Sequence, residues 1–212
     1  MKMNTNQMNK KMKIKFLSGL AALGLAAVLF TSCAKLPQAE IDTANAAIEE
    51  AKISGAEMYA KENFIALKDS MKSVMENIEF ENSKFFKSFS IAITDLEGVT
   101  QFAQEVKMET ATRKEELKAE IEATIAEVKS LLEINNMLIL DAPKGKEGTS
   151  ALVAIKGELA AIETSIQEAS TMMESEDYIA TLDKAKAAKE KASAINAELL
   201  DVIAKYKKNK RV

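Results

Sequence analysis

Apolar residues recur at alternating spacings of three and four along most of the chain after Pro37. One face of an α-helix collects residues at these spacings, whereas a half-buried strand alternates at every second residue. The first stretch ends at Ser54 and Gly55, and the second runs from Phe64 to Ile78. We therefore predict two amphipathic helices, with Gly55 in the left-handed conformation that commonly ends a helix.

The third stretch is far longer, because residues 83–134 contain no proline and a single glycine, Gly98. At about 1.5 Å per residue, one helix over this range would be roughly 75 Å long. Asn82 or Ser83 is placed to cap its start. The apolar pattern lapses at Thr110 and then resumes. We predict that two packing units share this helix and divide near residue 110.

Two more amphipathic stretches follow. One runs at strict three-four spacing from Leu152 to Met173, and the other runs from Tyr178 to Tyr206 after a polar reversal at residues 174–177. Three antiparallel helices in each unit can bury their apolar stripes against one another. The predicted fold is all-α: an elongated, spectrin-like antiparallel helical bundle or coiled-coil array with one very long central helix.

The two predicted hairpins have related apolar patterns. In the first, a polar turn is followed by Phe85 and Phe89, and in the second a polar turn is followed by Tyr178 and Leu182. This alignment pairs Phe85 with Tyr178 and Phe89 with Leu182. It is compatible with an internal duplication and equally with the general likeness of helical hairpins.

The first 32 residues have a different pattern. Five lysines and no acid precede an apolar run from Phe16 to Phe30. Such a run matches the central region of a secretory signal and is shorter than the about 20 residues that cross a bilayer. Ser32 and Cys33 then resemble the lipobox of bacterial lipoproteins, although Phe30 stands where most such motifs have leucine. The resemblance implies a signal peptide over residues 1–32, cleavage between Ser32 and Cys33, and a diacylglyceryl group on Cys33.

The alternative for Cys33 is a free thiol at the end of an uncleaved anchor. An exported lone thiol would be reactive, and acylation of the sulfur removes that reactivity. Ala34 occupies the second mature position, where by analogy an aspartate retains lipoproteins in the inner membrane. No acidic cluster of the kind that directs surface export follows Cys33. We therefore expect a bacterial envelope location, on the periplasmic face of the outer membrane.

The next segment carries the pattern A-x-x-A-I-x-x-A followed by G-A-x-x-Y-A. Its positions are Ala44, Ala47, Ile48, Ala51, Gly55, Ala56, Tyr59 and Ala60. The pattern resembles an α-helical bacterial envelope domain of unknown function, which often has proline where this chain has Lys61. The resemblance implies a helical envelope protein, sometimes found beside peptidoglycan-binding modules, and brings no catalytic residues. We assign residues 33–109 to this N-terminal unit and residues 110–212 to a C-terminal three-helix unit that shares the long helix.

Composition narrows the chemistry. The chain has 29 basic and 32 acidic residues, and five of the basic ones precede Cys33, so the remaining 24 leave a formal charge of −8 from Cys33 onward. This balance argues against nucleic acid as a partner. The chain also has no histidine and one cysteine, which removes the commonest general base and the usual metal ligands. We predict a protein that is not an enzyme and has no cofactor beyond the covalent lipid.

Two segments retain functional interest. Met137, Leu138, Ile139 and Leu140 follow the predicted long helix in a loop, where they either contact a partner or cap the bundle end. Basic residues crowd the last turns at Lys205, Lys207, Lys208, Lys210 and Arg211. The helix dipole alone favours cations there, and the functional alternative is contact with an anionic cell-wall polymer or lipid headgroups.

The predicted function is a membrane-anchored envelope lipoprotein that acts as a spacer, tether or scaffold through coiled-coil helices. Its partners would be the membrane, peptidoglycan or other envelope proteins, and exposed seams leave homo-oligomers open. The alternative is a periplasmic binding or chaperone-like module that holds an apolar ligand or client between its helices. Methionines on the apolar stripes, such as Met71 and Met75, motivate that alternative, although methionine is also an ordinary core filler.

Overall fold

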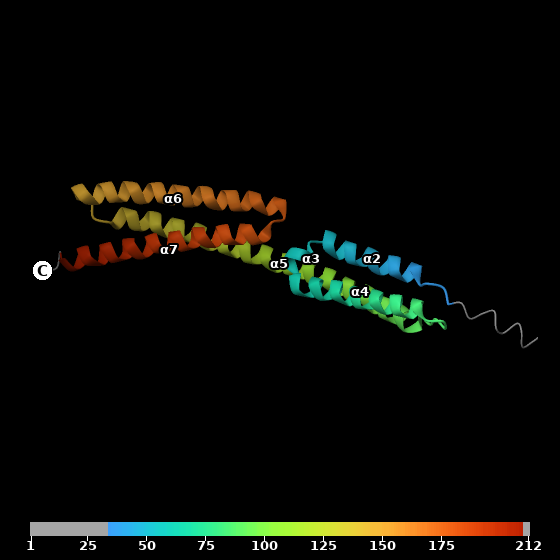
Figure 1. The fold of residues 1–212 in the computed structure, drawn as a ribbon. Helices are drawn as coiled ribbons and strands as arrows, with labels where there is room; N and C mark the ends of the chain where they lie inside the picture. The colour runs from blue at the N-terminus through green and yellow to red at the C-terminus, as the bar shows by residue number, and fades with distance from the viewer. Residues whose placement is uncertain (1–33, 210–212) are drawn as a thin grey trace, which may run out of the picture. The chain divides into compact units, whose positions relative to one another are not determined.

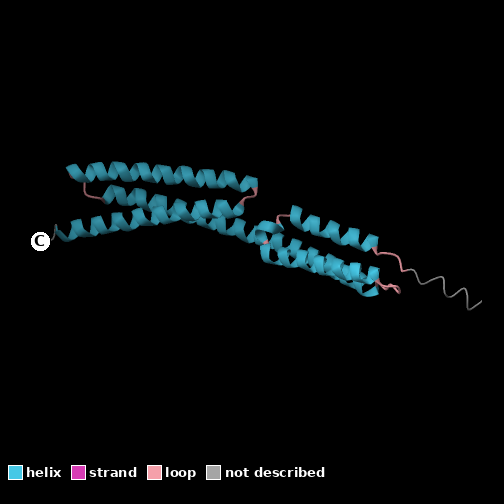
Figure 2. Cartoon of the chain, in the orientation of Figure 1, coloured by secondary structure: helices cyan, strands magenta, loops and turns pink. Residues whose placement is uncertain are grey.

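The computed structural model describes residues 34–209, and this part of the chain is all-α with no strand (Figures 1 and 2). The all-α prediction with one very long helix is confirmed. The elements are α2 (Gln38–Ile53), α3 (Ala56–Tyr59), α4 (Lys61–Ser83), α5 (Ser90–Asp141), α6 (Lys146–Met172), the 3-10 turn η2 (Met173–Ser175) and α7 (Tyr178–Asn209).

The packing divides the chain into two units, and α5 contributes to both. Unit 1 ends at Thr110 and unit 2 begins at Ala111. Thr110, where the apolar pattern lapses, is fully buried, and its hydroxyl donates to the Val106 carbonyl at 2.8 Å. The polar atom is thus satisfied within its own helix, so the lapse does not interrupt α5.

The predicted ends of the long helix were wrong. The helix begins at Ser90 and ends at Asp141, each seven residues after the predicted positions 83 and 134. Ser83 belongs to the last turn of α4, where its hydroxyl donates back to the Phe80 carbonyl at 2.7 Å. Neither Ser83 nor Asn82 therefore caps α5. At the other end the helix continues until Pro143 disfavours helical backbone in the preceding residue.

Unit 1 is built from α2, α4 and the first part of α5, with α2 parallel and α4 antiparallel to α5 (Figure 1). Glu50 of α2 pairs with Lys107 of α5 at 2.9 Å. On α4, the Asn63 amide donates to the Glu109 carboxylate of α5 at 2.7 Å. The largest fully buried apolar side chains of this unit are Phe64, Leu67, Ile78, Leu96 and Val106.

Gly55 makes the turn that ends α2. Its φ angle is 98°, in the left-handed region, and this confirms the conformation predicted from the sequence. The Gly55 N–H donates to the Lys52 carbonyl at 2.9 Å, while its own carbonyl accepts from the Tyr59 N–H at 3.1 Å. One residue therefore closes α2 and opens α3.

Replacing Gly55 with alanine is expected to destabilise unit 1 by roughly 1–2 kcal/mol, because a Cβ is strained at this φ. Gly98→Ala is the matched control in the same unit. A Cβ at Gly98 meets nothing within 4 Å, so this change should stabilise the helix by about 0.5–1 kcal/mol. Urea unfolding followed by circular dichroism measures both. A Gly55→Ala protein as stable as wild type would contradict the strained-turn argument.

Unit 2 is built from the second part of α5 with α6 and α7 (Figure 1). On α7, Lys186 pairs with Glu120 of α5 at 2.7 Å, and Lys184 pairs with Glu168 of α6. Lys189 of α7 also pairs with Glu127 of α5, so residue numbers rise together and the two helices are parallel. Figure 1 shows α7 antiparallel to α6. The core of this unit comprises Val128, Leu132, Ile139, Ile155, Leu159, Ile162, Ile166, Ala188, Ala192, Ile195 and Leu199.

The reversal predicted at residues 174–177 lies between α6 and α7. Glu176 there has a φ of 60°, in the left-handed region. Asp177 then accepts a hydrogen bond from the Ala180 N–H at 3.2 Å on its carboxylate. Such a bond satisfies one of the unpaired donors in the first turn of a helix, so Asp177 fixes where α7 begins.

Candidate functional site

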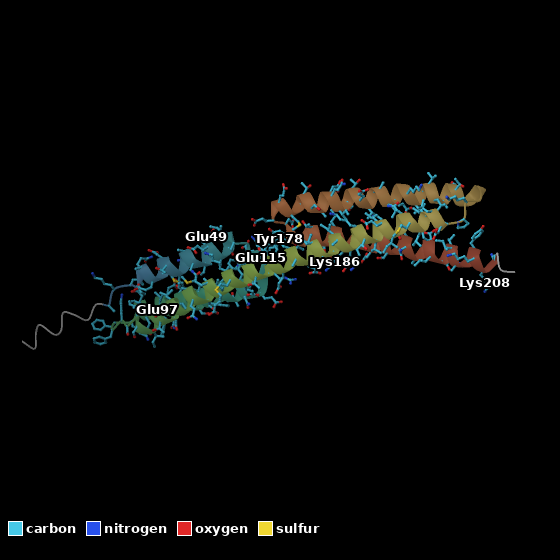
Figure 3. The ribbon with its side chains drawn as sticks, turned by 180° about the vertical axis from the view of Figure 1, so that it is seen from behind. Glu49, Glu97, Glu115, Tyr178, Lys186 and Lys208 are labelled. Carbon is cyan, nitrogen blue, oxygen red and sulfur yellow. The ribbon has the colours of Figure 1, made fainter. Side chains whose placement is uncertain are left out.

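The candidate segments of the C-terminal half meet at one end of unit 2. At this end α5 stops at Asp141, α6 starts at Lys146, and the last turns of α7 run past the connection between them (Figure 1). Lys208 marks the same end in Figure 3. The structure therefore brings residues 137–140 and the basic residues Lys205, Lys207 and Lys208 of α7 to the same end of unit 2, which we call the basic end.

The prediction of a loop for residues 137–140 was wrong, because these residues form the last turns of α5. Helical geometry divides them between two faces. Ile139 is only 3% exposed and belongs to the core, and Leu138 packs against that core. Met137 and Leu140 face outward, and Leu140 is 69% exposed. Thus part of the segment closes the bundle end, and the other part is available for contact.

A shallow hollow lies between the last turn of α5 and the first turns of α6. Leu140, Leu152 and Val153 give it an apolar lining, and Lys144 and Lys156 also border it. The hollow thus combines exposed apolar carbon with two cations. This combination suits a partner that offers an apolar group beside an anion.

The described cations of the basic end lie on the last turns of α7. Lys205 pairs with Asp201 at 2.6 Å, whereas Lys207 and Lys208 are exposed in the last turn. The predicted contacts Lys210 and Arg211 lie outside the described residues. The helix dipole favours positive charge at the C-terminal end of α7, so these lysines are compatible with a stable helix.

Several exposed ion pairs fix neighbouring segments to α5. The Lys107 ammonium lowers the pKa of Glu50, mainly by its hydrogen bond and further by its charge. The Lys114 ammonium lowers the pKa of Glu176 in the same way, at 2.8 Å. Figure 3 shows Tyr178 near Glu115; hydrogen bonds of Lys118 with Glu115 and with Tyr178 raise the pKa of the lysine. Exposed pairs of this kind contribute little stability each, and their role here is structural.

Cys33, the predicted lipidation site, lies outside the described residues. The whole predicted signal segment, which ends at Ser32, also lies outside them. Within residues 34–209, no helix has the length and apolarity needed to cross a bilayer. In the same range, no three histidine, cysteine, aspartate or glutamate side chains gather in a way that could hold a metal ion.

Comparison of the chain with protein-family models, with curated proteins and with solved structures finds no match. The resemblance of the alanine-rich pattern to an envelope domain therefore stays a prediction.

The sequence reasoning missed a buried polar pair. Asn135 of α5 is fully buried. Its amide donates to the Ala192 carbonyl of α7 at 2.8 Å and its carbonyl accepts from the Asn196 amide at 2.8 Å. Buried asparagines in helical seams specify which residues face one another. The signal was present, because Leu132, Asn135 and Ile139 continue the three-four spacing.

An exposed aromatic group was also missed. Phe85 is 91% exposed and Phe86 is 75% exposed, so the alignment of Phe85 with the buried Tyr178 was wrong. Phe89, by contrast, is buried as Leu182 is. The two consecutive phenylalanines stand between Lys84 and Lys87, and these flanking charges were the signal that could have marked a surface feature.

The methionines that motivated the binding-module alternative occupy the core of unit 1. Met71 is buried, and Met75 packs against the same cluster. Both fill space between the helices of unit 1. This placement favours the core-filler interpretation of these two methionines.

Proposed function

We propose that the chain is a non-enzymatic lipoprotein of the bacterial envelope, anchored through Cys33 on the periplasmic face of the outer membrane. In this proposal it serves as a spacer, tether or scaffold, and the basic end of unit 2 contacts its target. The observation that supports the proposal best is α5, a single helix of 52 residues on which both units are built.

Connectivity supports a division of tasks between the two ends of α5. Cys33 precedes α2, which packs beside the first turns of α5 in unit 1. The basic end of unit 2 lies beside the last turns of α5. Attachment and recognition would thus belong to different units of the chain, with α5 contributing to both.

Composition supports a role without catalysis. The chain has no histidine and one cysteine, and that cysteine is the proposed acylation site. The exposed cations and apolar side chains of the basic end suit binding to an anionic surface. Peptidoglycan and anionic envelope proteins are targets of this chemistry.

Reversing the charge of Lys207 and Lys208 is expected to weaken binding of the lipidated protein to purified peptidoglycan sacculi by about tenfold or more, since each lysine near an anionic surface contributes on the order of 1 kcal/mol. Sedimentation with sacculi measures this. Binding of the wild type should also fall as salt screens the attraction.

The matched control reverses two exposed lysines in the middle of unit 2, Lys129→Glu with Lys191→Glu, for the same change in net charge. This control should retain most of the binding. An equal loss in both variants would show that net charge alone matters. A wild-type protein that neither sacculi nor envelope proteins retain would contradict the tether proposal.

A further inference from the structure

The most exposed aromatic side chains among residues 34–209 gather where α4 turns into α5. Phe85 and Phe86 occupy the connecting loop with their rings edge to face, 5.0 Å between centroids. Phe80, in the last turns of α4, is also exposed, and the Lys84 ammonium lies 4.4 Å from its ring centre. We call Phe80, Phe85 and Phe86 the aromatic tip. Their apolar surface is exposed at the end of a hairpin.

The start of α2 lies at the same end of unit 1. Glu50 and Lys107, which pair, are 57 residues apart in sequence. Thr43 and Thr100, also 57 apart, line one groove between α2 and α5. This constant offset brings the start of α2 level with residue 95. That position is only five residues, or about 7.5 Å, along α5 from its first residue.

The described chain therefore begins near the aromatic tip. Residues 34–37 precede α2, and four residues span at most about 13 Å. Figure 1 shows this segment and the α4–α5 connection at one end of unit 1. Cys33, the proposed site of the lipid, immediately precedes this segment in the sequence.

We propose that the aromatic tip enters the interfacial region of the bilayer that holds the lipid anchor, as a second attachment point. This inference rests on the proposed anchoring through Cys33. Aromatic rings favour the membrane interface, and flanking lysines can extend their ammonium groups to the headgroups. Tethering at Cys33 would keep the tip at a high effective concentration near the surface, so even weak insertion would be occupied.

Local charge indicates what drives the insertion. Lys84 pairs with Glu81 at 2.7 Å, and the Lys87 ammonium donates to the Asn82 side chain at 2.7 Å. Glu79 is a second acid in this region, so the four ionic side chains carry no net charge. The rings, rather than electrostatic attraction, therefore drive the contact. Insertion should persist at high salt, unlike binding at the basic end.

The chain has no tryptophan, so Phe86→Trp introduces a single depth-sensitive fluorophore. The full lipidated protein is reconstituted in phosphatidylethanolamine and phosphatidylglycerol vesicles that contain brominated lipid. We expect a blue-shifted emission and at least about twofold quenching, unchanged at high salt, as the ring leaves water for the interface. Ile53→Trp is the control, since Ile53 is 78% exposed at the other end of α2. It should show neither effect.

The outcomes separate the two proposals. Vesicles that sediment with the Phe86→Trp protein while its indole stays unquenched would overturn insertion of the tip and leave the anchor intact. Protection of that indole from a soluble quencher without quenching by brominated lipid would indicate a protein contact and would also overturn it. Protein that fails to sediment with vesicles would contradict the lipid anchor itself, and the inference would fall with it.

Discussion

Replacing Cys33 with serine is expected to abolish fatty-acid labelling of the protein and to leave the precursor uncleaved. A thiolate is the nucleophile that such acylation requires, and a serine hydroxyl at the same position is far less reactive. The effect should be all or none. Metabolic labelling with an alkyne fatty acid, read with gel mobility, measures acylation and the loss of residues 1–32 in one experiment.

Ser32→Ala is the matched control for this experiment, because it keeps a small residue before the cysteine. The control should be labelled and cleaved as the wild type is. Normal labelling of Cys33→Ser would refute the lipobox assignment, and cleavage without labelling would support an ordinary secretory signal. The first result would place the lipid on another residue, and the second would remove the membrane from the proposed function.

The strength of the anchor decides what the rest of the chain must contribute. Each buried methylene contributes about 0.8 kcal/mol, so one acyl chain holds marginally and two or more hold firmly. The aromatic tip is therefore not needed to keep the protein on the membrane. Its effect would be on orientation, because a second contact beside Cys33 limits how unit 1 can tilt and rotate.

The spacing of apolar residues was enough to predict the helices of this fold. The three-four spacing of apolar residues is a direct consequence of helical geometry. Gly55 can be assigned to a turn because few other residues tolerate a positive φ. Gly55 was predicted for this reason and has the predicted conformation. The fold class therefore followed from local rules.

Helix ends were harder to predict, because polar residues serve several roles. Ser83 can cap the start of a helix or close the end of one, and its hydroxyl bonds backward to Phe80. Asn135 is of a residue type common in loops, although it continues the three-four spacing of Leu132 and Ile139. Residue type and spacing therefore disagreed at this position, and the partners on α7 decide between them.

Candidate contacts were predicted by residue type but not by direction. Leu138 and Leu140 are the same residue type and only two positions apart, yet the first packs against the core and the second faces outward. Phe85 was aligned with a core position although it is almost fully exposed. Residue chemistry identified apolar segments, whereas the side of α5 on which each residue lies determined which side chains a partner could reach.

Replacing Asn135 with aspartate is expected to lower the free energy of unfolding of unit 2 by roughly 3 kcal/mol or more. The change keeps the size of the side chain but removes the donor to the Ala192 carbonyl and places a carboxylate against it. Burial of that carboxylate would raise its pKa above the unfolded value of about 3.9. The native state then binds the proton more tightly than the unfolded state does. The free energy of unfolding should therefore fall as pH rises from the unfolded pKa toward the higher native pKa. Urea unfolding at several pH values measures the effect.

Asn136→Asp supplies the control, because Asn136 is the next residue of α5 and is exposed. It should change stability by no more than about 0.5 kcal/mol. Equal effects of the two changes would show that helix charge, and not the buried hydrogen bonds, is responsible. Asn135→Leu then separates polarity from packing. It leaves the Asn196 amide without its acceptor but adds no buried charge, so it should lower stability less than the aspartate change does, while removing the polar contact that sets the register of α5 and α7. A seam without this polar contact can also pair with a second copy of the chain, so light scattering should detect a higher mass. An unchanged mass would mean that the apolar seam alone sets the pairing.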